Sequence, residues 1–257
     1  MSMVLVFGGT TEGKMAMAVL AAADLPFWYS TKIAIDVDLP AGGHYRYGAF
    51  STAALLAFCE THSISLIIHA SHPFAAELHT TIGEVSERMG IPVVRPERAY
   101  PETSTHPLIR YADSYSEVLE ALLRHNYEPV LSLTGVQTIA RWKPYWQQKK
   151  MFCRILPRDT SLAIAQADNF PEDQLLLSFP GKTVEEELAV IQQTGAEAVV
   201  TKESGESGFL SVKQRAAIAA GKPLYIIRRP VLPAHFIKVE GAEGLRQYLH
   251  QHKMKAL

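Results

Sequence analysis

A glycine-rich segment stands directly after the first apolar run of the chain. Val4–Phe7 is rich in strand-forming residues, and residues 8–13 read Gly-Gly-Thr-Thr-Glu-Gly before a helix-forming stretch up to Ala23. Glycines there let the backbone approach a diphosphate, and the following helix offers unpaired N–H groups and the positive end of its dipole. Thr10 stands where the middle glycine of G-x-G-x-x-G belongs, so a tight turn capped by threonine is the alternative. The candidate cofactor-binding residues of this segment are Gly8, Gly9, Thr10, Thr11 and Glu12.

Hydroxyl groups and a cation follow the second expected strand. Phe27–Ser30 is predicted as a strand, and Ser30, Thr31 and Lys32 stand at its carboxyl end. Dinucleotide-binding folds that prefer NAD often carry an acidic residue near this point for the ribose hydroxyl. The hydroxyls and ammonium of this chain suit a 2′-phosphate instead, which favours NADP, and a solvated loop is the alternative.

Two histidines and a serine follow a third expected strand. Leu66–Ile68 has the pattern of a buried strand and leads into His69-Ala-Ser-His-Pro-Phe-Ala. Ser71 and His72 therefore fall at a strand's carboxyl end, where open parallel sheets bind their ligands. A Ser–His nucleophile lacks the G-x-S-x-G context, and a metal site lacks neighbouring carboxylates, so no metal is expected. A capping or packing role is the alternative for each histidine.

A fourth candidate segment, again rich in Gly, Ser and Thr, lies in the second half of the chain. Residues 201–208 read Thr-Lys-Glu-Ser-Gly-Glu-Ser-Gly after the apolar run Ala198–Val200, and Thr134-Gly135 forms a smaller version after Val130–Leu133. Hydroxyls, backbone amides and a lysine that converge in this way suit a carboxylate or phosphate. A flexible Gly/Ser loop is the alternative. The candidate substrate-binding residues are Thr134, Gly135, Lys202, Ser204 and Gly205.

Basic residues gather near the expected strand ends and near the middle of the chain. They would suit a polycarboxylate substrate through charge-assisted hydrogen bonds, and scattered surface charge is the alternative. These residues are Arg95, Arg98, Arg141, Lys143, Arg154, Arg158, Arg228 and Arg229.

Strand and helix patterns alternate along both halves of the chain. Such alternation predicts an α/β fold with two parallel sheets, each covered by helices on both faces. The pattern breaks between Arg95 and Pro107, where three prolines fall in a polar stretch. We therefore expect two domains, residues 1–104 for the cofactor and residues 105–257 for the substrate.

Composition narrows the classes of function. The 257 residues carry 25 Lys and Arg against 26 Asp and Glu, a net charge of −1 that provides no bulk field for nucleic acid or an anionic membrane. The start of the chain lacks a basic region and a cleavage site, and no apolar run reaches the roughly 20 residues that cross a bilayer. Cys59 and Cys153 have no CxxC partner, so two free, half-buried thiols are expected, and one bridge between them is the alternative. A soluble cytoplasmic protein follows.

Taken in order, these segments resemble the precorrin-6A reductase family of cobalamin biosynthesis, which includes the cobalt-precorrin-6A reductases. The matching pieces are residues 8–13, His72-Pro73-Phe74-Ala75, Thr134-Gly135, Thr201-Lys202-x-Ser204-Gly205 and Arg229-Pro230. The chain departs from the family at three places. His69 takes the position of a usual aspartate, Phe179-Pro180-Gly181 replaces Gly-Pro-Phe, and residues 206–209 replace paired glycines.

The resemblance implies two Rossmann-like three-layer domains with an interdomain cleft. It implies hydride transfer from NADPH, or from NADH, to a macrocycle double bond of precorrin-6A or cobalt-precorrin-6A, which gives precorrin-6B or its cobalt form. Partners would be this tetrapyrrole and, where they associate, neighbouring pathway enzymes. Ser71 and His72 would lie near the nicotinamide, and the proton would come from His72, Lys202 or solvent.

Two other classes of function remain open from the residues alone. A redox sensor with a dinucleotide site should bind NADPH without oxidising it. A nucleotide-sugar transferase, which also pairs two Rossmann-like domains, should bind a nucleotide sugar and ignore NADPH. Neither class explains the ordered loops of the second half.

Overall fold

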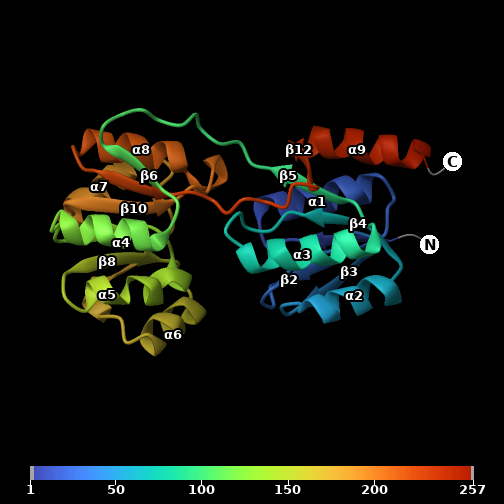
Figure 1. Ribbon diagram of the computed structural model, residues 1–257, viewed down its shortest axis with the longest axis horizontal. Coiled ribbons are helices and arrows are strands. Elements are labelled where there is room, and N and C mark those ends of the chain that lie inside the picture. The colour runs from blue at the N-terminus through green and yellow to red at the C-terminus, as the bar shows by residue number, and fades with distance from the viewer. Residues whose placement is uncertain (1–2, 256–257) are drawn as a thin grey trace. The chain divides into compact units, whose positions relative to one another are not determined.

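The computed structural model describes residues 3–255, with side chains up to Gln251, and divides the chain into two compact units. Unit 1 contains the chain up to Ala99 and again from Pro230, whereas unit 2 contains Tyr100–Arg229. Each unit is a parallel sheet between two layers of helices (Figure 1). The predicted α/β class with two Rossmann-like domains is therefore confirmed.

The sheet of unit 1 has six parallel strands in the order β12-β5-β4-β1-β2-β3. The chain crosses the sheet outward from β1 in both directions, so the switch point lies between β1 and β4. The strands are β1 Met3–Phe7, β2 Phe27–Thr31, β3 Gly43–Tyr47, β4 Ile64–His69, β5 Val93–Glu97 and β12 Ile237–Glu240.

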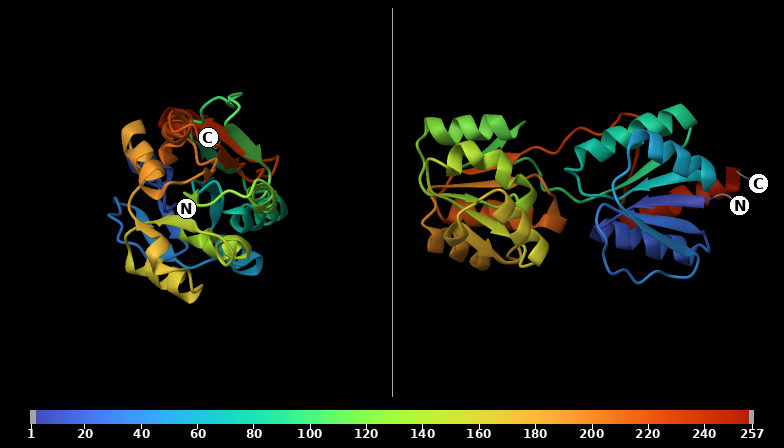
Figure 2. Two further views of the ribbon diagram at one scale, coloured as in Figure 1. Left: turned by 90° about the vertical axis from the view of Figure 1, so that its left-hand side faces the viewer. Right: turned by 90° about the horizontal axis from the view of Figure 1, so that it is seen from below.

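Alternate residues of the strands pack against different helices of unit 1. Val4 and Val6 lie in one apolar cluster with the buried faces of α1 (Thr11–Ala22) and α9 (Gly241–Lys255). Leu5 and Phe7 lie in the other cluster with α2 (Thr52–Thr61) and α3 (Ala76–Met89). This period of two is that of a strand covered on both faces, and the right panel of Figure 2 shows the two helix layers.

Unit 2 repeats this architecture. Its six parallel strands have the order β6-β11-β10-β7-β8-β9, which places the switch point between β7 and β10. The strands are β6 Ile109–Ala112, β7 Val130–Ser132, β8 Met151–Ile155, β9 Leu175–Leu177, β10 Ala198–Lys202 and β11 Leu224–Ile227.

Helices cover both faces of the unit 2 sheet. Helices α7 (Val184–Thr194) and α8 (Leu210–Ala219) pack on one face, where Leu131, Val199 and Ile226 form the core. Figure 2 shows α4 (Tyr115–Arg124) on the opposite face. The remaining elements are the 3-10 helices η1 Val136–Trp142, η2 Glu172–Gln174 and η3 Glu206–Gly208 and the short helices α5 Lys143–Trp146 and α6 Asp159–Ala167.

One edge strand of each sheet, β12 in unit 1 and β6 in unit 2, was not predicted from the sequence. β6 precedes the other strands of unit 2, and β12 joins unit 1 by pairing with β5 after the whole of unit 2. The sequence predicts a second domain that runs to residue 257, whereas the structure returns the chain to unit 1 at Pro230. The reason is the β5–β12 pairing together with Leu245 and Leu249 of α9, which are buried in the unit 1 core.

Local signals place most helix ends correctly. Ser51 caps α2, and Thr183 with Glu186 forms the predicted capping box of α7. Gly90 and Gly195 end α3 and α7 in the left-handed conformation. The cap predicted at Ser116 is wrong, because the hydroxyl of Ser114 accepts the hydrogen bond from the N–H of Glu117.

Candidate functional sites at the two switch points

The glycine-rich segment forms the loop between β1 and α1 at the switch point of unit 1. A Cβ on Gly8 would lie 2.2 Å from the ring of Tyr29, and Gly9 has a φ of +85°, so both positions require glycine. Tyr29, which the sequence did not single out, accepts a hydrogen bond from the N–H of Gly9 at 2.8 Å. Gly9 and Thr11 remain exposed at the start of α1. The loop thus brings backbone and a helix N-terminus to the surface with no side chain in between.

Thr10 connects this loop to the loop after β4. Its hydroxyl accepts from the N–H of Gly13 at 3.1 Å and donates to the carbonyl of Ala70 at 2.5 Å. The carboxylate of Glu12 pairs with Arg98 at 3.0 Å. The Thr10 hydrogen bond therefore brings residues 8–12 and 70–72 together. The guanidinium of Arg98 neutralises the carboxylate of Glu12, which would otherwise repel an anion at the N-terminus of α1.

A buried guanidinium holds the histidine-containing loop. Nη1 of Arg95 donates to the carbonyls of His69 and Ser71 at 2.8 and 2.9 Å. Burial, followed by the positive charge of Arg95, lowers the pKa of His69 well below its ordinary value and that of His79 to about 4. Both imidazoles are neutral at physiological pH, and their rings pack edge to face. His69 is therefore a core residue, and the packing alternative holds for it.

His72 has a different environment from His69. It is half-buried, and its Nδ1 accepts a hydrogen bond from the N–H of Phe74 at 3.1 Å. An Nδ1 that accepts leaves Nε2 as the protonated nitrogen of a neutral ring. The loop therefore fixes a tautomer in which Nε2–H is a donor.

Ser30, Thr31 and Lys32 lie at the carboxyl end of β2, and the first two have side-chain partners within the protein. The Thr31 hydroxyl bonds the carbonyl of Ile33 and the hydroxyl of Tyr45 at 2.7 and 2.8 Å, and Lys32 is exposed. The Ser30 hydroxyl accepts from Nη1 of Arg46 at 2.8 Å. Arg46 comes from β3, a strand that the sequence did not predict, and its guanidinium stacks 3.7 Å above the ring of Phe50. Arg46 is the fixed cation at this end of the sheet.

The loop after β10 lies at the switch point of unit 2 and turns tightly on itself. Gly205 has a φ of +73°, and a Cβ on Gly208 would lie 2.1 Å from Oγ of Ser204. The N–H of Ser204 donates to the carbonyl of Lys202 at 2.7 Å. Burial lowers the pKa of Lys202 to about 8. The structure thus brings Lys202, Ser204 and Gly205 together in one loop, as predicted.

Thr134 follows β7 at the same switch point, but its side chain faces inward. The hydroxyl bonds those of Ser132 and Thr138 at 2.7 and 2.6 Å and accepts from Nε1 of Trp142 at 3.0 Å. The side chain is 1% exposed. Its hydroxyl therefore stabilises the turn, and the adjacent half-exposed Gly135, with a φ of +83°, is the residue that presents backbone outward.

Sequence reasoning treated Arg154 as one basic residue among eight and missed its partners. Arg154 pairs with Glu187 of α7 at 2.8 Å, and both side chains are buried. Lys213 of α8 is 5% exposed and donates to the carbonyl of Gly208 at 2.7 Å. Burial, followed by the charge of Arg154, lowers the pKa of Lys213 to about 8. Nothing in the sequence distinguishes Lys213 and Glu187 from the exposed charged residues that most helices carry.

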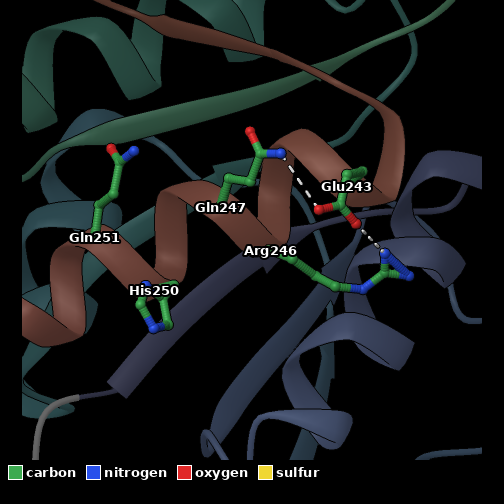
Figure 3. A pocket seen from close by; sticks show the side chains of 5 residues that line it. All are labelled: Glu243, Arg246, Gln247, His250 and Gln251. Carbon is green, nitrogen blue, oxygen red and sulfur yellow. Dashed lines mark hydrogen bonds and ion pairs between the residues drawn. The ribbon is translucent and has the colours of Figure 1, made fainter.

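A surface hollow lies on α9, away from both switch-point loops in the sequence (Figure 3). Its lining comes from that helix alone, and Glu243 accepts from Arg246 and Gln247 of the same helix. A site made from one helix face with internally paired polar groups does not enclose a ligand. Among the residues whose side chains are described, no cluster of three or more His, Cys, Asp or Glu could hold a metal ion.

The two parallel sheets, each with its own switch point and covering helices, define a two-unit Rossmann-like α/β protein. The family model for "Precorrin-6x reductase CbiJ/CobK" matches residues 3–250, and the chain belongs to this family. The family match confirms the resemblance seen in the motifs, and the protein is an oxidoreductase of cobalamin biosynthesis. No helix within the described part of the chain is long and apolar enough to span a membrane.

Characterised relatives agree with the family. The chain is 34% identical over 191 residues to a cobalt-precorrin-6A reductase of Synechocystis sp., covering 71% of this chain and 70% of the relative. It is 31% identical over 253 residues to a precorrin-6A reductase of Rhodococcus erythropolis, covering 95% and 96%. A solved structure of CobK precorrin-6A reductase superimposes with a TM-score of 0.78 at 23% identity over 98% of both chains, which shows the same fold.

Proposed function

We propose that the protein reduces one double bond of precorrin-6A or cobalt-precorrin-6A with NADPH, giving the dihydro product. One observation carries the proposal: in a chain matched by the reductase family over residues 3–250, the loops after β1 and β10 both fall at switch points. The first loop has the properties of a diphosphate site and the second those of a carboxylate site. Unit 1 is then the cofactor unit and unit 2 the substrate unit.

The β1–α1 loop fits a dinucleotide. Gly9 is exposed, and a Cβ there would meet only the Thr31 methyl at 3.8 Å, so a diphosphate has room against the backbone. The N–H groups of Gly9 and Gly13 bond inside the protein. The N–H of Thr11, the first residue of α1, is the donor we assign to the diphosphate. When bound, the nicotinamide supplies the hydride.

Arg46 supports a preference for NADPH over NADH. Its guanidinium is fixed by Ser30, by the carbonyls of Tyr47 and Gly48, and by stacking on Phe50. A held guanidinium at the ends of β2 and β3 is the group that accommodates a 2′-phosphate in this fold. We therefore assign the main contact with the 2′-phosphate to Arg46, in place of the Ser30, Thr31 and Lys32 that the sequence indicated.

Lys202 and the backbone of the 204–205 turn would bind carboxylates of the macrocycle. The lowered pKa of Lys202, about 8, also makes it a better proton donor near neutral pH than an ordinary lysine. His72 offers Nε2–H from the loop after β4. Lys202, His72 and solvent therefore remain the three proposed proton sources. Lys202→Ala and His72→Ala, compared at saturating substrate, separate them by their loss of kcat.

The decisive experiment is an anaerobic absorbance assay. The protein is mixed with NADPH or NADH and with precorrin-6A or cobalt-precorrin-6A, and oxidation of the cofactor is followed in all four combinations. We expect oxidation with NADPH and one of the two tetrapyrroles. Binding of NADPH without oxidation in every combination would show a redox sensor, and binding of a nucleotide sugar with no response to NADPH would show a transferase.

Arg46→Met tests the cofactor preference. Loss of a charge-assisted contact to the 2′-phosphate should raise the Kd of NADPH roughly 10- to 100-fold and leave that of NADH nearly unchanged. Arg124→Met, at the end of α4 in unit 2, is the control for removal of a positive charge. Equal weakening of both cofactors would show that Arg46 only stabilises the strand ends.

A further inference from the structure

Unit 2 places three cations and one carboxylate within electrostatic range of one another. Lys213 of α8 interacts with Arg154 of β8, Glu187 of α7 and Lys202 at the end of β10. Arg154, Glu187 and Lys213 are each at least nine-tenths buried. If all four groups are ionised, the cluster carries two excess positive charges in a region of low dielectric.

The carboxylate of this cluster is already engaged. Oε1 of Glu187 accepts from Arg154 at 2.8 Å and from the N–H of Gly181 at 2.7 Å, and Oε2 accepts from Arg154 at 2.9 Å. The acceptor of Lys213 is the carbonyl of Gly208, a neutral group that cannot cancel a charge. The ammonium of Lys213 is therefore hydrogen-bonded and still electrostatically uncompensated.

The position of Lys213 on its helix adds to this imbalance. It is the fourth residue of α8, close to the end at which the helix dipole disfavours a cation. A side chain at this position points back toward the N-terminus, which is how its ammonium reaches Gly208. Burial, neighbouring cations and the dipole thus all oppose a charge at this point, a combination expected where a protein is built to meet an anion.

The anion has a defined place to bind. The bond from Lys213 to Gly208 ties the end of the 202–208 loop to α8, while the packing of Gly208 on Ser204 closes the turn. The backbone of this loop and Lys202 lie at the carboxyl edge of the sheet. Lys213 thus stands directly behind the loop that would bind a substrate carboxylate.

We propose that Lys213 is a positioning residue for one carboxylate of the tetrapyrrole: it fixes the 205–208 turn and supplies the buried positive charge that the loop presents to this carboxylate. The inference rests on the proposed function and adds a specificity residue to it. It predicts that the site selects an ionised carboxylate and that binding depends on protonated lysine.

The test compares Lys213→Met and Lys213→Arg with Lys222→Met, which removes a positive charge beyond the other end of α8. Binding of cobalt-precorrin-6A is titrated by absorbance without cofactor, and kcat is measured at saturating substrate. Lys213→Met should raise the Kd roughly 10- to 100-fold, the effect of losing one charge-assisted interaction, with kcat within about threefold of wild type. Lys213→Arg should restore most of the affinity, and Lys222→Met should bind like wild type.

Two further readouts separate positioning from a merely structural role. Lys213→Met should unfold at a temperature no lower than wild type, because it removes an uncompensated buried charge. In wild type the affinity should fall above about pH 8 as both lysines lose their protons, and in Lys213→Met this fall should become shallower by one proton. The wild-type pH profile tests the proposal even if the methionine variant does not fold.

Unchanged affinity in Lys213→Met, or wild-type affinity that stays constant from pH 7 to pH 9.5, would overturn the proposal. A stability loss in Lys213→Met without a change in affinity would assign the residue to the fold alone. Failure of the proposed function has a different signature, since wild type itself would then neither bind nor reduce the tetrapyrrole.

Discussion

Units 1 and 2 each have a six-stranded parallel sheet with one switch point, but they treat charge in opposite ways there. In unit 1 the guanidinium of Arg95 is buried against backbone carbonyls, and its positive charge helps to keep the imidazoles of His69 and His79 neutral. In unit 2 Lys213 lies within electrostatic range of Lys202 and Arg154, and the carboxylate of Glu187 is already paired with Arg154. Unit 1 therefore offers an anion backbone N–H groups and a helix end, whereas unit 2 offers ammonium groups. A shared architecture sets where a ligand binds, and the buried charges set which ligand.

The largest effect should come from removing the carboxylate of the unit 2 cluster. Glu187→Gln leaves Arg154 and Lys213 buried without a countercharge, so the free energy of unfolding should fall by about 3–5 kcal/mol. The loss should be confined to unit 2 and can be followed by hydrogen exchange of the strands β7, β8 and β10. Glu186→Gln is the matched control, because the exposed Glu186 belongs to the capping box, a role that glutamine also fills. Equal losses in both variants would show that the cluster is not under electrostatic strain.

The two units should also respond to pH in different ranges. An unfolded histidine titrates near pH 6.5, but His79 in the fold has a pKa of about 4, so between these values the unfolded chain binds a proton that the folded unit 1 does not. Unit 1 should therefore lose stability as the pH falls from 6.5 to 4. Lys213 has a pKa of about 8 against an ordinary value of 10.5, so unit 2 should gain stability as the pH rises between these values.

Each of these two effects is of the order of 3 kcal/mol at full titration. Hydrogen exchange of β1 and β4 against β7 and β10 at pH 4.5, 7 and 9.5 measures them separately. His79→Phe should weaken only the acid response of unit 1, where His69 still titrates, and Lys213→Met should weaken only the alkaline response of unit 2, where Lys202 still titrates. The same pH profile for both units would remove the contrast between them.

Sequence patterns predicted the central strands of both sheets. They missed both edge strands of unit 1, β3 and β12, and one edge strand of unit 2, β6. Central strands such as Val4–Phe7 are buried on both faces and read as apolar runs. The missed strands β3, β6 and β12 read GHYRY, IRYA and IKVE, and β3 and β12 are largely exposed. These three edge strands lack an apolar run, unlike the edge strand β9, which reads LLL and is predicted. Because β3 was not predicted, Arg46, which lies on this strand, was not identified as a candidate site residue either.

Motifs predicted the tight turns at the two switch points but not the partners of the charged side chains near them. Gly8, Gly9 and the 202–208 loop require glycine or tight turns, a local property that the sequence carries directly. Arg95, Glu187 and Lys213 act through partners brought together by the fold, and their side chains are indistinguishable in the sequence from exposed charges. Burial of a charge is a tertiary property, and the structure is needed to reveal it.

Thr134 shows this distinction at one residue and gives the smallest predicted effect. Its hydroxyl is saturated by Ser132, Thr138 and Trp142 and has no capacity left for substrate. Thr134→Val should leave Nε1–H of Trp142 buried without its acceptor and lower the free energy of unfolding by about 1–2 kcal/mol. The KM for the tetrapyrrole should stay within about twofold of wild type, because the variant keeps the backbone of Gly135 in place. Thr134→Ser, which retains the hydroxyl, should restore the stability. A large rise in KM at unchanged stability would instead show that the hydroxyl turns outward and binds substrate, and it would extend the ligand surface of unit 2 from β10 to β7.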